Sequence, residues 1–330
     1  MGTGIGSEME LSGRMVITGG CGFIGTNFVR FVADNFSALE LLVFDKLTYA
    51  GNLENIADLI EAGRVKFIRG DISNPKDTER LFEGVRYVVN FAAETHVDRS
   101  LVDPVPFVRT NICGVANMLE LLRKHPCVRF LHISSDEVYG PRDEKTPADE
   151  SSPLAPTNPY AVTKASGDML CISYARSFDL DILIARPTNN YGPYQFPEKI
   201  IPLFITNAIQ NKPLPLYGDG LYIRDWLFVT DTVKAILMLL KKGGSGEIYN
   251  IAGRTPIKNI DIAQRVLELT NRKNELITYT TDRKIHDRAY FIDDSRIRSL
   301  GWAPEVSFEE GIRVTVDFYK SKLAGIKSTK

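Results

Sequence analysis

Apolar runs alternate with amphipathic stretches through the first 187 residues of the chain. The runs predict strands, because they are short and bounded by turn residues. They are MVIT (15–18), LLVFD (41–45), VKFIRGD (65–71), RYVVNFAA (86–93), VRFLHISS (128–135) and DILIARP (181–187). Helical spacing is found between them over residues 22–35, 54–62, 75–84, 104–124 and 159–178. Strands alternating with helices form parallel βαβ units, so the sequence predicts an α/β fold with a doubly wound parallel sheet.

This rhythm changes beyond Pro187, where prolines recur between residues 193 and 215. Helices are predicted over 199–210, 231–241, 259–271 and 308–322, and short strands near 215–217, 247–251 and 276–280. We expect residues 14–187 to form a Rossmann-type nucleotide-binding domain, to which a helix and strand at about 228–252 return. The remainder of residues 188–330 is expected to form a smaller, interleaved α/β C-terminal substrate domain.

The ends and the composition of the chain bear on its compartment and partners. Residues 1–13 are small and polar with no apolar core of a signal peptide, so a disordered leader is predicted. No long uninterrupted apolar stretch predicts a membrane span. The net charge of −1 provides no basic field for nucleic acid or an anionic membrane surface. We therefore expect a cytoplasmic protein that binds neither.

The cysteines and histidines do not suggest a metal site. Cys21, Cys113, Cys127 and Cys171 are the only cysteines, none at CxxC spacing, and the chain has four histidines. We expect no metal, and four reduced, packed or idle thiols.

A glycine-rich turn joins the first predicted strand to the first helix. In TGGCGFIG (18–25), Gly19, Gly22 and Gly25 permit a tight turn and close approach of a pyrophosphate to a helix N-terminus. The strand before it and the helix after it favour a dinucleotide site over a purely structural turn.

Acidic residues at the next two strand ends refine this prediction. Asp45 is placed to accept hydrogen bonds from both ribose hydroxyls, which favours NAD over NADP, although Lys46 beside it weakens the preference. Asp71 is expected to border the adenine; an Asx turn before Pro75 is the alternative.

Tyr160 and Lys164 stand at YxxxK spacing at the start of the helix predicted over 159–178. Residues four apart share one helix face, and a nearby ammonium favours tyrosinate and lowers the pKa of the phenol. The tyrosine can then take a proton from a substrate hydroxyl as hydride leaves. An aromatic anchor beside a solvated lysine is the alternative.

The fifth predicted strand runs into SSDEVYG (134–140), which brings Ser135, Asp136 and Glu137 to the edge where ligands bind. Coupling between two adjacent like charges raises the pKa of one of the two carboxyl groups, leaving an acid beside a base. Such a pair suits elimination of water. The alternative interpretation of the two acidic residues is a turn that caps a helix.

The chain resembles dTDP-glucose 4,6-dehydratases, which are extended short-chain dehydrogenases/reductases, over nearly its whole length after residue 13. The matching stretches are TGGCGFIG (18–25), DKLTYAGN (45–52), FAAETHVDRS (91–100), SSDEVYG (134–140), NPYAVTKAS (158–166), NNYGPYQFPEKIIP (189–202), LYGDGLYIRDWLFV (216–229) and HDRAY (286–290).

The resemblance implies a three-part reaction on tightly bound NAD. Tyr160, supported by Lys164, would deprotonate the sugar 4-hydroxyl during oxidation at C4. Glu137 would then remove the C5 proton while Asp136 protonates the leaving C6 hydroxyl, and hydride would return to C6. Ser135 stands where the family usually has Thr; its hydroxyl can still bond the 4-hydroxyl.

The resemblance also implies two sets of binding residues. The cofactor set is Gly19, Gly22, Phe23, Ile24, Gly25, Asp45, Lys46, Thr48, Asp71, Ile72, Phe91, Ala92, Ala93, Thr110, Tyr160, Lys164 and Asn189. The set for the nucleotide sugar is Thr95, Ser135, Asn190, Glu198, Lys199, Pro215, Tyr217, Arg224, Asn259, Arg283, His286 and Tyr290. Arg224 and Arg283 suit a pyrophosphate, since guanidinium binds phosphate in a fork.

One departure from the family concerns the last of these clusters. The family usually reads DRPGHDRRY, whereas this chain reads DRKIHDRAY (282–290), with Lys284 and Ile285 in place of Pro and Gly. Thymidine and uridine both remain open as the nucleobase. The family tends to form dimers through two helices, here about 104–124 and 159–178, so the resemblance implies a homodimer.

Two rival functions remain open at this point. A sugar-nucleotide 4-epimerase or decarboxylase shares the glycine turn and YxxxK, but an epimerase has no use for the Asp136–Glu137 pair. A non-catalytic NAD-binding protein could keep the glycines, but has no use for Tyr160, Lys164 and both carboxylates together.

Overall fold

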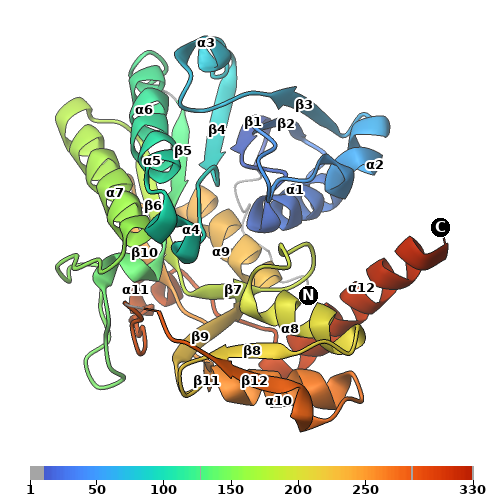
Figure 1. Cartoon of the computed structure of the whole chain (residues 1–330). Helices are drawn as coiled ribbons and strands as arrows, with labels where there is room; N and C mark the ends of the chain where they lie inside the picture. The colour runs from blue at the N-terminus through green and yellow to red at the C-terminus, as the bar shows by residue number, and fades with distance from the viewer. Residues whose placement is uncertain (1–10, 127, 284, 329–330) are drawn as a thin grey trace, which may run out of the picture.

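A seven-stranded parallel sheet forms the centre of the molecule, with strand order β3-β2-β1-β4-β5-β6-β10 (Figure 1). The computed structural model describes residues 11–126, 128–283 and 285–328. The chain order reverses between β1 and β4, so the predicted doubly wound α/β fold is confirmed. The strands are β1 (Gly13–Thr18), β2 (Leu39–Asp45), β3 (Val65–Arg69), β4 (Val85–Asn90), β5 (Arg129–Ile133), β6 (Ile182–Pro187) and β10 (Ile248–Ile251).

Helices cover both faces of this sheet, because its strands are apolar on both sides. One core joins Phe28 and Ile236 of two helices to Met15 and Val43 of the sheet. The other joins Met118 and further apolar side chains to the opposite face. The first face carries α1 (Phe23–Asn35), α2 (Ala57–Glu61) and α9 (Val229–Lys242); the second carries α6 (Val115–Arg123) and α7 (Pro159–Phe178).

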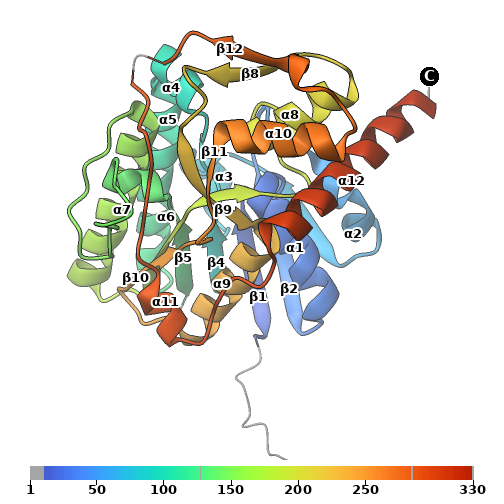
Figure 2. The same cartoon turned by 90° about the horizontal axis from the view of Figure 1, so that it is seen from below.

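A smaller α/β unit lies against the carboxyl ends of the strands (Figure 2). Its core contains Phe204, Trp226, Val266 and Ile312. Its strands form a three-stranded sheet, β11-β9-β7, and a two-stranded parallel sheet, β12-β8. Its elements are β7 (Asn189–Tyr191), α8 (Ile200–Ile209), β8 (Leu214–Tyr217), β9 (Ile223–Phe228), β11 (Pro256–Lys258), α10 (Asn259–Leu269), β12 (Ile277–Thr280) and α12 (Phe308–Ser328).

The helix predicted over 104–124 is present from Val105 to Arg123, but it is not α-helical throughout. It consists of α5 (Val105–Phe107), a π-helical segment, η2 (Val108–Gly114), and then α6. The wider turn brings Asn111 into the interior, where its side chain bonds the backbone of Glu94 and the Thr163 hydroxyl. These tertiary hydrogen bonds stabilise the extra residue of the π turn, and they were not visible in the periodicity.

Other boundaries also differ from prediction. The helix expected over 75–84 is shorter and consists of α3 (Pro75–Thr78). Beyond it, backbone hydrogen bonds join residues three apart, such as Leu81 N to Thr78 O, rather than the four apart of an α-helix. Unpredicted elements are α4 (Val97–Val102), α11 (Ser295–Ser299) and strands β7, β9 and β11.

The predicted leader of residues 1–13 extends too far into the chain. Leu11 is buried in the first core, and Gly13 begins β1. Residues 1–10 lie outside the described residues.

The start of α7 is fixed by local chemistry. The Asn158 side chain caps the helix by accepting a hydrogen bond from Ala161 N, and Pro159 occupies the first turn. Tyr160 therefore lies in the first turn of α7, and Lys164 follows one turn later. Asp179 ends the helix with a left-handed conformation, φ 53°.

Candidate active site

The glycine-rich turn lies between β1 and α1, at the point where the sheet order reverses. Gly19 has a φ of 68°, and a Cβ there would lie 2.6 Å from the backbone N of Ala92. A Cβ on Gly25 would lie 2.3 Å from the Gly19 carbonyl oxygen. No side chain caps the N-terminus of α1 at Gly22. The turn thus forms a cradle that fits a pyrophosphate, whose charge the helix N-terminus would stabilise.

Gly25→Ala is expected to abolish retention of a dinucleotide, because the new methyl group displaces the Gly19 carbonyl and closes the cradle. The dinucleotide content of the purified variant, released by denaturation and quantified by chromatography, measures this. Gly244→Ala is the matched control, since the atoms nearest to its Cβ would be side-chain atoms, of Glu247 at 3.1 Å and of Tyr249 at 3.6 Å. A Gly25→Ala protein that retains as much dinucleotide as the control would contradict the cradle.

Asp45, at the end of β2, is positioned to bind a ribose. Asp45 is 8% exposed, and its two carboxylate oxygens accept hydrogen bonds from Cys21 N (2.9 Å) and Leu47 N (2.8 Å). Each oxygen keeps a lone pair for a further donor. Burial raises the Asp45 pKa, and these two bonds oppose that rise.

Lys46 and Asp71 form a salt bridge at the same end of the sheet. Their Nζ–Oδ2 distance is 2.7 Å, and Lys46 thereby balances a neighbouring carboxylate. The other Asp71 oxygen accepts from Ser73 N, so the Asx turn considered above is present, while Asp71 also borders the pocket. Burial tends to raise the Asp71 pKa, but Lys46 and Ser73 hold it below its ordinary value.

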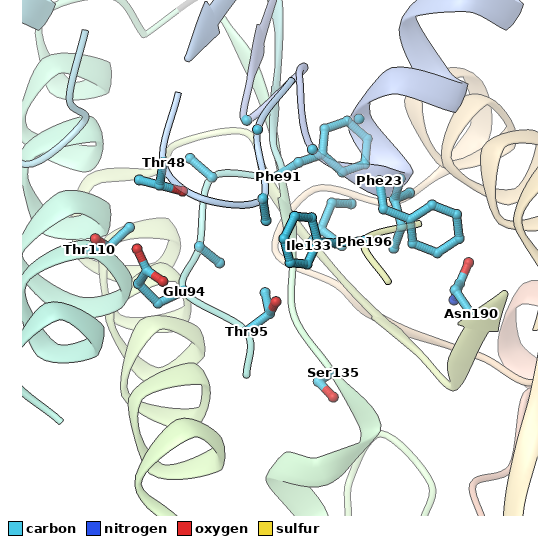
Figure 3. A pocket seen from close by; sticks show the side chains of 18 of the residues that line it. Phe23, Thr48, Phe91, Glu94, Thr95, Thr110, Ile133, Ser135, Asn190 and Phe196 are labelled. Atoms are coloured by element: carbon cyan, nitrogen blue, oxygen red, sulfur yellow. The ribbon is translucent and has the colours of Figure 1, made fainter. Parts of the chain in front are cut away.

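A pocket follows the carboxyl ends of β1, β4 and β5, and all residues of the predicted cofactor set line it. Figure 3 shows Thr48, Glu94 and Thr110 at one end, the apolar Phe91 and Ile133 in the middle, and Ser135 apart from both.

Four side chains, of which Phe196 and Glu198 line this pocket, connect the two parts of the molecule; we call them the clasp. The Arg99 guanidinium lies 3.7 Å from the centroid of the Tyr49 ring and pairs with Glu198 at 3.1 Å. The Tyr49 ring meets the Phe196 ring edge-on, with centroids 5.5 Å apart. The clasp joins the loop after β2 to α4 and to the segment before α8.

Tyr160 and Lys164 are both buried, 7% and 3% exposed. The Lys164 ammonium donates to the Ile133 carbonyl oxygen at 2.5 Å. Burial lowers its pKa to about 8, and Asp168 opposes that shift. The predicted lowering of the Tyr160 pKa by Lys164 is not found: burial raises that pKa, Glu137 raises it further, and a hydrogen bond with Ser135 lowers it. The ammonium is directed to the Ile133 carbonyl rather than to the phenol.

The two adjacent acids have different surroundings. Asp136 is 3% exposed, and its Oδ1 accepts from the Ser135 hydroxyl at 3.1 Å. Burial, followed by the charge of Glu137, raises its pKa to about 8. Glu137 is less buried and accepts from Asn158 Nδ2 at 3.1 Å. Asp136 is therefore protonated at neutral pH and can act as an acid beside the carboxylate of Glu137.

A second pocket lies between the sheet and the smaller unit. The first pocket contains Thr95, Ser135 and Asn190 of the predicted substrate set; Glu198 and Lys199 line both pockets. Glu137 and Asn189 also line both, so the pockets meet beside Glu137. The second pocket contains the rest of that set, namely Pro215, Tyr217, Arg224, Asn259, Arg283, His286 and Tyr290.

The cations and rings of the second pocket are held in place by neighbours. The Arg283 guanidinium pairs with Asp98, with an Nε–Oδ1 distance of 2.6 Å, and lies 4.7 Å from the Tyr217 ring centroid. Arg224 lies 4.7 Å from the Tyr290 ring centroid. These contacts fix two guanidinium groups where an anion could bind.

A stacked pair of rings lies nearby, at the loop that departs from the family pattern. His286 lies against Tyr222, with centroids 3.5 Å apart and ring planes 15° apart, and its Nδ1 meets Asp282 at 2.7 Å. Ile285 lines the same pocket and is 47% exposed. Lys284 lies outside the described residues.

Some predicted site residues have their polar groups already engaged. Both ends of the Asn190 amide bond within the protein, to Thr188 O and to the Thr232 hydroxyl. Lys199 Nζ donates to Thr95 O at 2.8 Å, and burial lowers the Lys199 pKa. By contrast, the side-chain oxygens of Asn189 and Asn259 are buried without a partner among the described residues.

Sequence reasoning missed Asn158, whose amide holds Glu137 while its oxygen caps α7. Its position before Pro159 was a capping signal, but the contact with Glu137 is tertiary. His96 and Asp98, which line the second pocket, were also missed, although both lie in the matching stretch FAAETHVDRS (91–100).

Within the described residues, no helix combines the length and apolar character that a membrane span requires. Cys21, Cys113 and Cys171 are free thiols. Cys127 lies outside the described residues.

Comparison with known proteins places this geometry in a family. The model of the family described as GDP-mannose 4,6 dehydratase matches residues 16–315. The chain belongs to this family. A dTDP-glucose 4,6-dehydratase of Streptomyces niveus is 42% identical over 316 residues, which cover 94% of each chain.

Solved structures of the family share the fold. A dTDP-glucose 4,6-dehydratase of Streptomyces venezuelae, crystallised with NAD, has a TM-score of 0.91 and 41% identity, covering 94% of this chain and 98% of that one. A UDP-glucose 4-epimerase of Thermotoga maritima has a TM-score of 0.87 but 30% identity, covering 94% and 99%. The relatives thus include both the predicted reaction and its rival.

Proposed function

We propose that this protein converts dTDP-glucose to dTDP-4-keto-6-deoxyglucose and water with bound NAD. The observation that carries the proposal is a buried acid, Asp136, whose pKa is raised to about 8, directly beside Glu137, where the two pockets meet. An acid beside a base is what loss of water from adjacent carbons requires. The similar dTDP-glucose 4,6-dehydratases support the choice of substrate, and the NAD-bound structure supports the cofactor.

The glycine cradle and Asp45 would hold the dinucleotide, which supplies a hydride acceptor at C4 and a hydride donor at C6. Tyr160 takes the proton of the sugar 4-hydroxyl, and Ser135 bonds the same hydroxyl. Lys164, whose ammonium bonds the Ile133 carbonyl, provides a buried positive charge one helical turn from Tyr160. All three groups line the first pocket.

Elimination follows once C4 is a ketone, because a ketone acidifies the neighbouring C5–H. Glu137 removes the C5 proton, and Asp136 gives its proton to the C6 hydroxyl, which leaves as water. Asn158 directs the Glu137 carboxylate by a hydrogen bond. Asp136 loses its proton as pH rises through about 8, so elimination should weaken there.

The rest of the nucleotide sugar would occupy the second pocket. Arg224 and Arg283 would bind the diphosphate, and Tyr217 and His286 lie near the base. We assign residues 14–187, with 228–252, to NAD binding and the remainder of 188–330 to the sugar nucleotide. Thymine is favoured over uracil by the relatives.

We further propose a cytoplasmic homodimer. Apolar side chains are exposed along α5, η2 and α7, where Val105 is 60%, Val162 45% and Met169 57% exposed. A second copy could cover them, since exposed apolar groups are costly when they are clustered.

Mass spectrometry of the purified protein with dTDP-glucose, and separately UDP-glucose, tests the function. Loss of one water from dTDP-glucose without consumption of added NAD is the expected result. No change of mass with either substrate, together with isomerisation of the sugar detected by NMR, would assign a 4-epimerase instead. Greater yield from UDP-glucose would reassign the nucleobase.

A further inference from the structure

A row of buried polar side chains runs beneath the first pocket and across the sheet. The Thr18 hydroxyl donates to Asn90 Oδ1 at 2.5 Å, and Asn90 Nδ2 lies 3.0 Å from His132 Nδ1. His132 Nε2 lies 3.8 Å from Asp168 Oδ1, and Asp168 Oδ2 accepts from Arg186 Nε at 2.8 Å. The five residues come from β1, β4, β5, α7 and β6, and none is more than 1% exposed.

The hydrogen bonds of this row determine the charge of its histidine. Asn90 Oδ1 is occupied by Thr18, so the Asn90 amide donates, and His132 Nδ1 must accept. The His132 proton is then on Nε2, directed toward Asp168. Burial, followed by the charges of Lys164 and Arg186, holds the His132 pKa well below its ordinary value, so the ring is neutral.

Asp168 is thus the anion of a site that contains two buried cations. It lies one turn after Lys164 on α7 and pairs with Arg186. The ionisable groups whose charges act on Lys164 are Asp168 and Cys171 on α7, and Lys164 in turn acts on His132 of β5. Burial raises the Cys171 pKa well above its ordinary value, so that thiol carries no charge.

We propose that Asp168 is a positioning residue that acts through Lys164, keeping the buried ammonium charged while Tyr160 accepts the substrate proton. The inference rests on the proposed function. Desolvation disfavours an isolated buried ammonium, whereas a fixed carboxylate one helical turn away favours it. Burial raises the Asp168 pKa, and Arg186 opposes that rise by its charge and its hydrogen bond, which also holds the carboxylate in place.

The test is the pH dependence of C4 oxidation alone. dTDP-6-deoxyglucose has no hydroxyl on C6, so it can be oxidised at C4 but cannot eliminate water, and Asp136 plays no part. Stopped-flow absorbance of reduced nicotinamide gives the oxidation rate of the holoenzyme at each pH. In the wild type this rate should fall as Lys164 loses its proton near pH 8. Asp168→Asn should move that basic limb about one pH unit or more lower.

Three further variants separate charge from structure. Asp168→Glu keeps the charge with a worse fit, so its basic limb should stay near that of the wild type. Asp168→Asn with Arg186→Met removes the buried pair together, so that Arg186 is not left unpaired; its limb should also move lower. Asp231→Asn, a buried acid that bonds Glu305 N and Val306 N away from the site, should not move the limb.

The outcomes distinguish the two hypotheses. A basic limb that coincides with the wild type in both Asp168→Asn variants would overturn the role of Asp168, even if the rate falls equally at every pH. Failure of the wild-type enzyme to dehydrate dTDP-glucose would overturn the proposed function itself.

Discussion

Tyr160→Phe is expected to lower the rate of C4 oxidation by about 10²–10⁴-fold, the usual contribution of a general base. The phenylalanine ring can keep the edge-on contact with Phe107, whose ring centroid lies 6.5 Å away. The substitution removes only the hydroxyl, together with its bond to Ser135. Dinucleotide retention and thermal stability should therefore change little while chemistry stops.

The measurement is the appearance of reduced nicotinamide after mixing the holoenzyme with dTDP-glucose. Tyr249→Phe is the matched control, because this tyrosine is also buried but its hydroxyl accepts from Gly244 N, away from the pockets. Near-normal oxidation by Tyr160→Phe would mean that another group takes the proton.

Glu137→Gln should separate the two halves of the reaction. The amide has nearly the shape of the carboxylate but cannot take the C5 proton, so product formation should fall by about 10²–10⁴-fold. Oxidation at C4 does not use Glu137, so reduced nicotinamide should accumulate. Removing the neighbouring charge should also lower the Asp136 pKa, which Glu137 now raises.

Absorbance of reduced nicotinamide and mass spectrometry of the sugar nucleotide, recorded on the same sample, give both readouts. Glu150→Gln is the control, since Glu150 is a partly buried acid that accepts from Asn250 N outside the pockets. Native-rate product from Glu137→Gln would show that a different base acts at C5. Loss of oxidation as well would show that Glu137 is needed earlier.

The sequence predicted the strands of the central sheet well, because buried parallel strands are continuous apolar runs. The glycine turn and the Tyr160–Lys164 pair could be predicted for a related reason. Both are local patterns whose spacing along the chain already determines their spacing in space.

Features that depend on partners far away in the sequence could not be predicted. The π turn around Asn111 exists because Glu94 and Thr163 bond its side chain. The short strands β7 and β11 have three residues each, too few for an alternation to register. The direction of the Lys164 ammonium depends on the Ile133 carbonyl, which no spacing rule reveals.

The clasp of Tyr49, Arg99, Phe196 and Glu198 has a consequence for how such an enzyme could cycle. An ordinary dehydrogenase must release its spent coenzyme after every reaction, so its coenzyme site must open at least as fast as the enzyme turns over. Here the proposed reaction restores the coenzyme to its starting oxidation state. A clasp that stays closed beside the dinucleotide would not lower the turnover rate, provided that the second pocket exchanges sugar nucleotides through its own entrance.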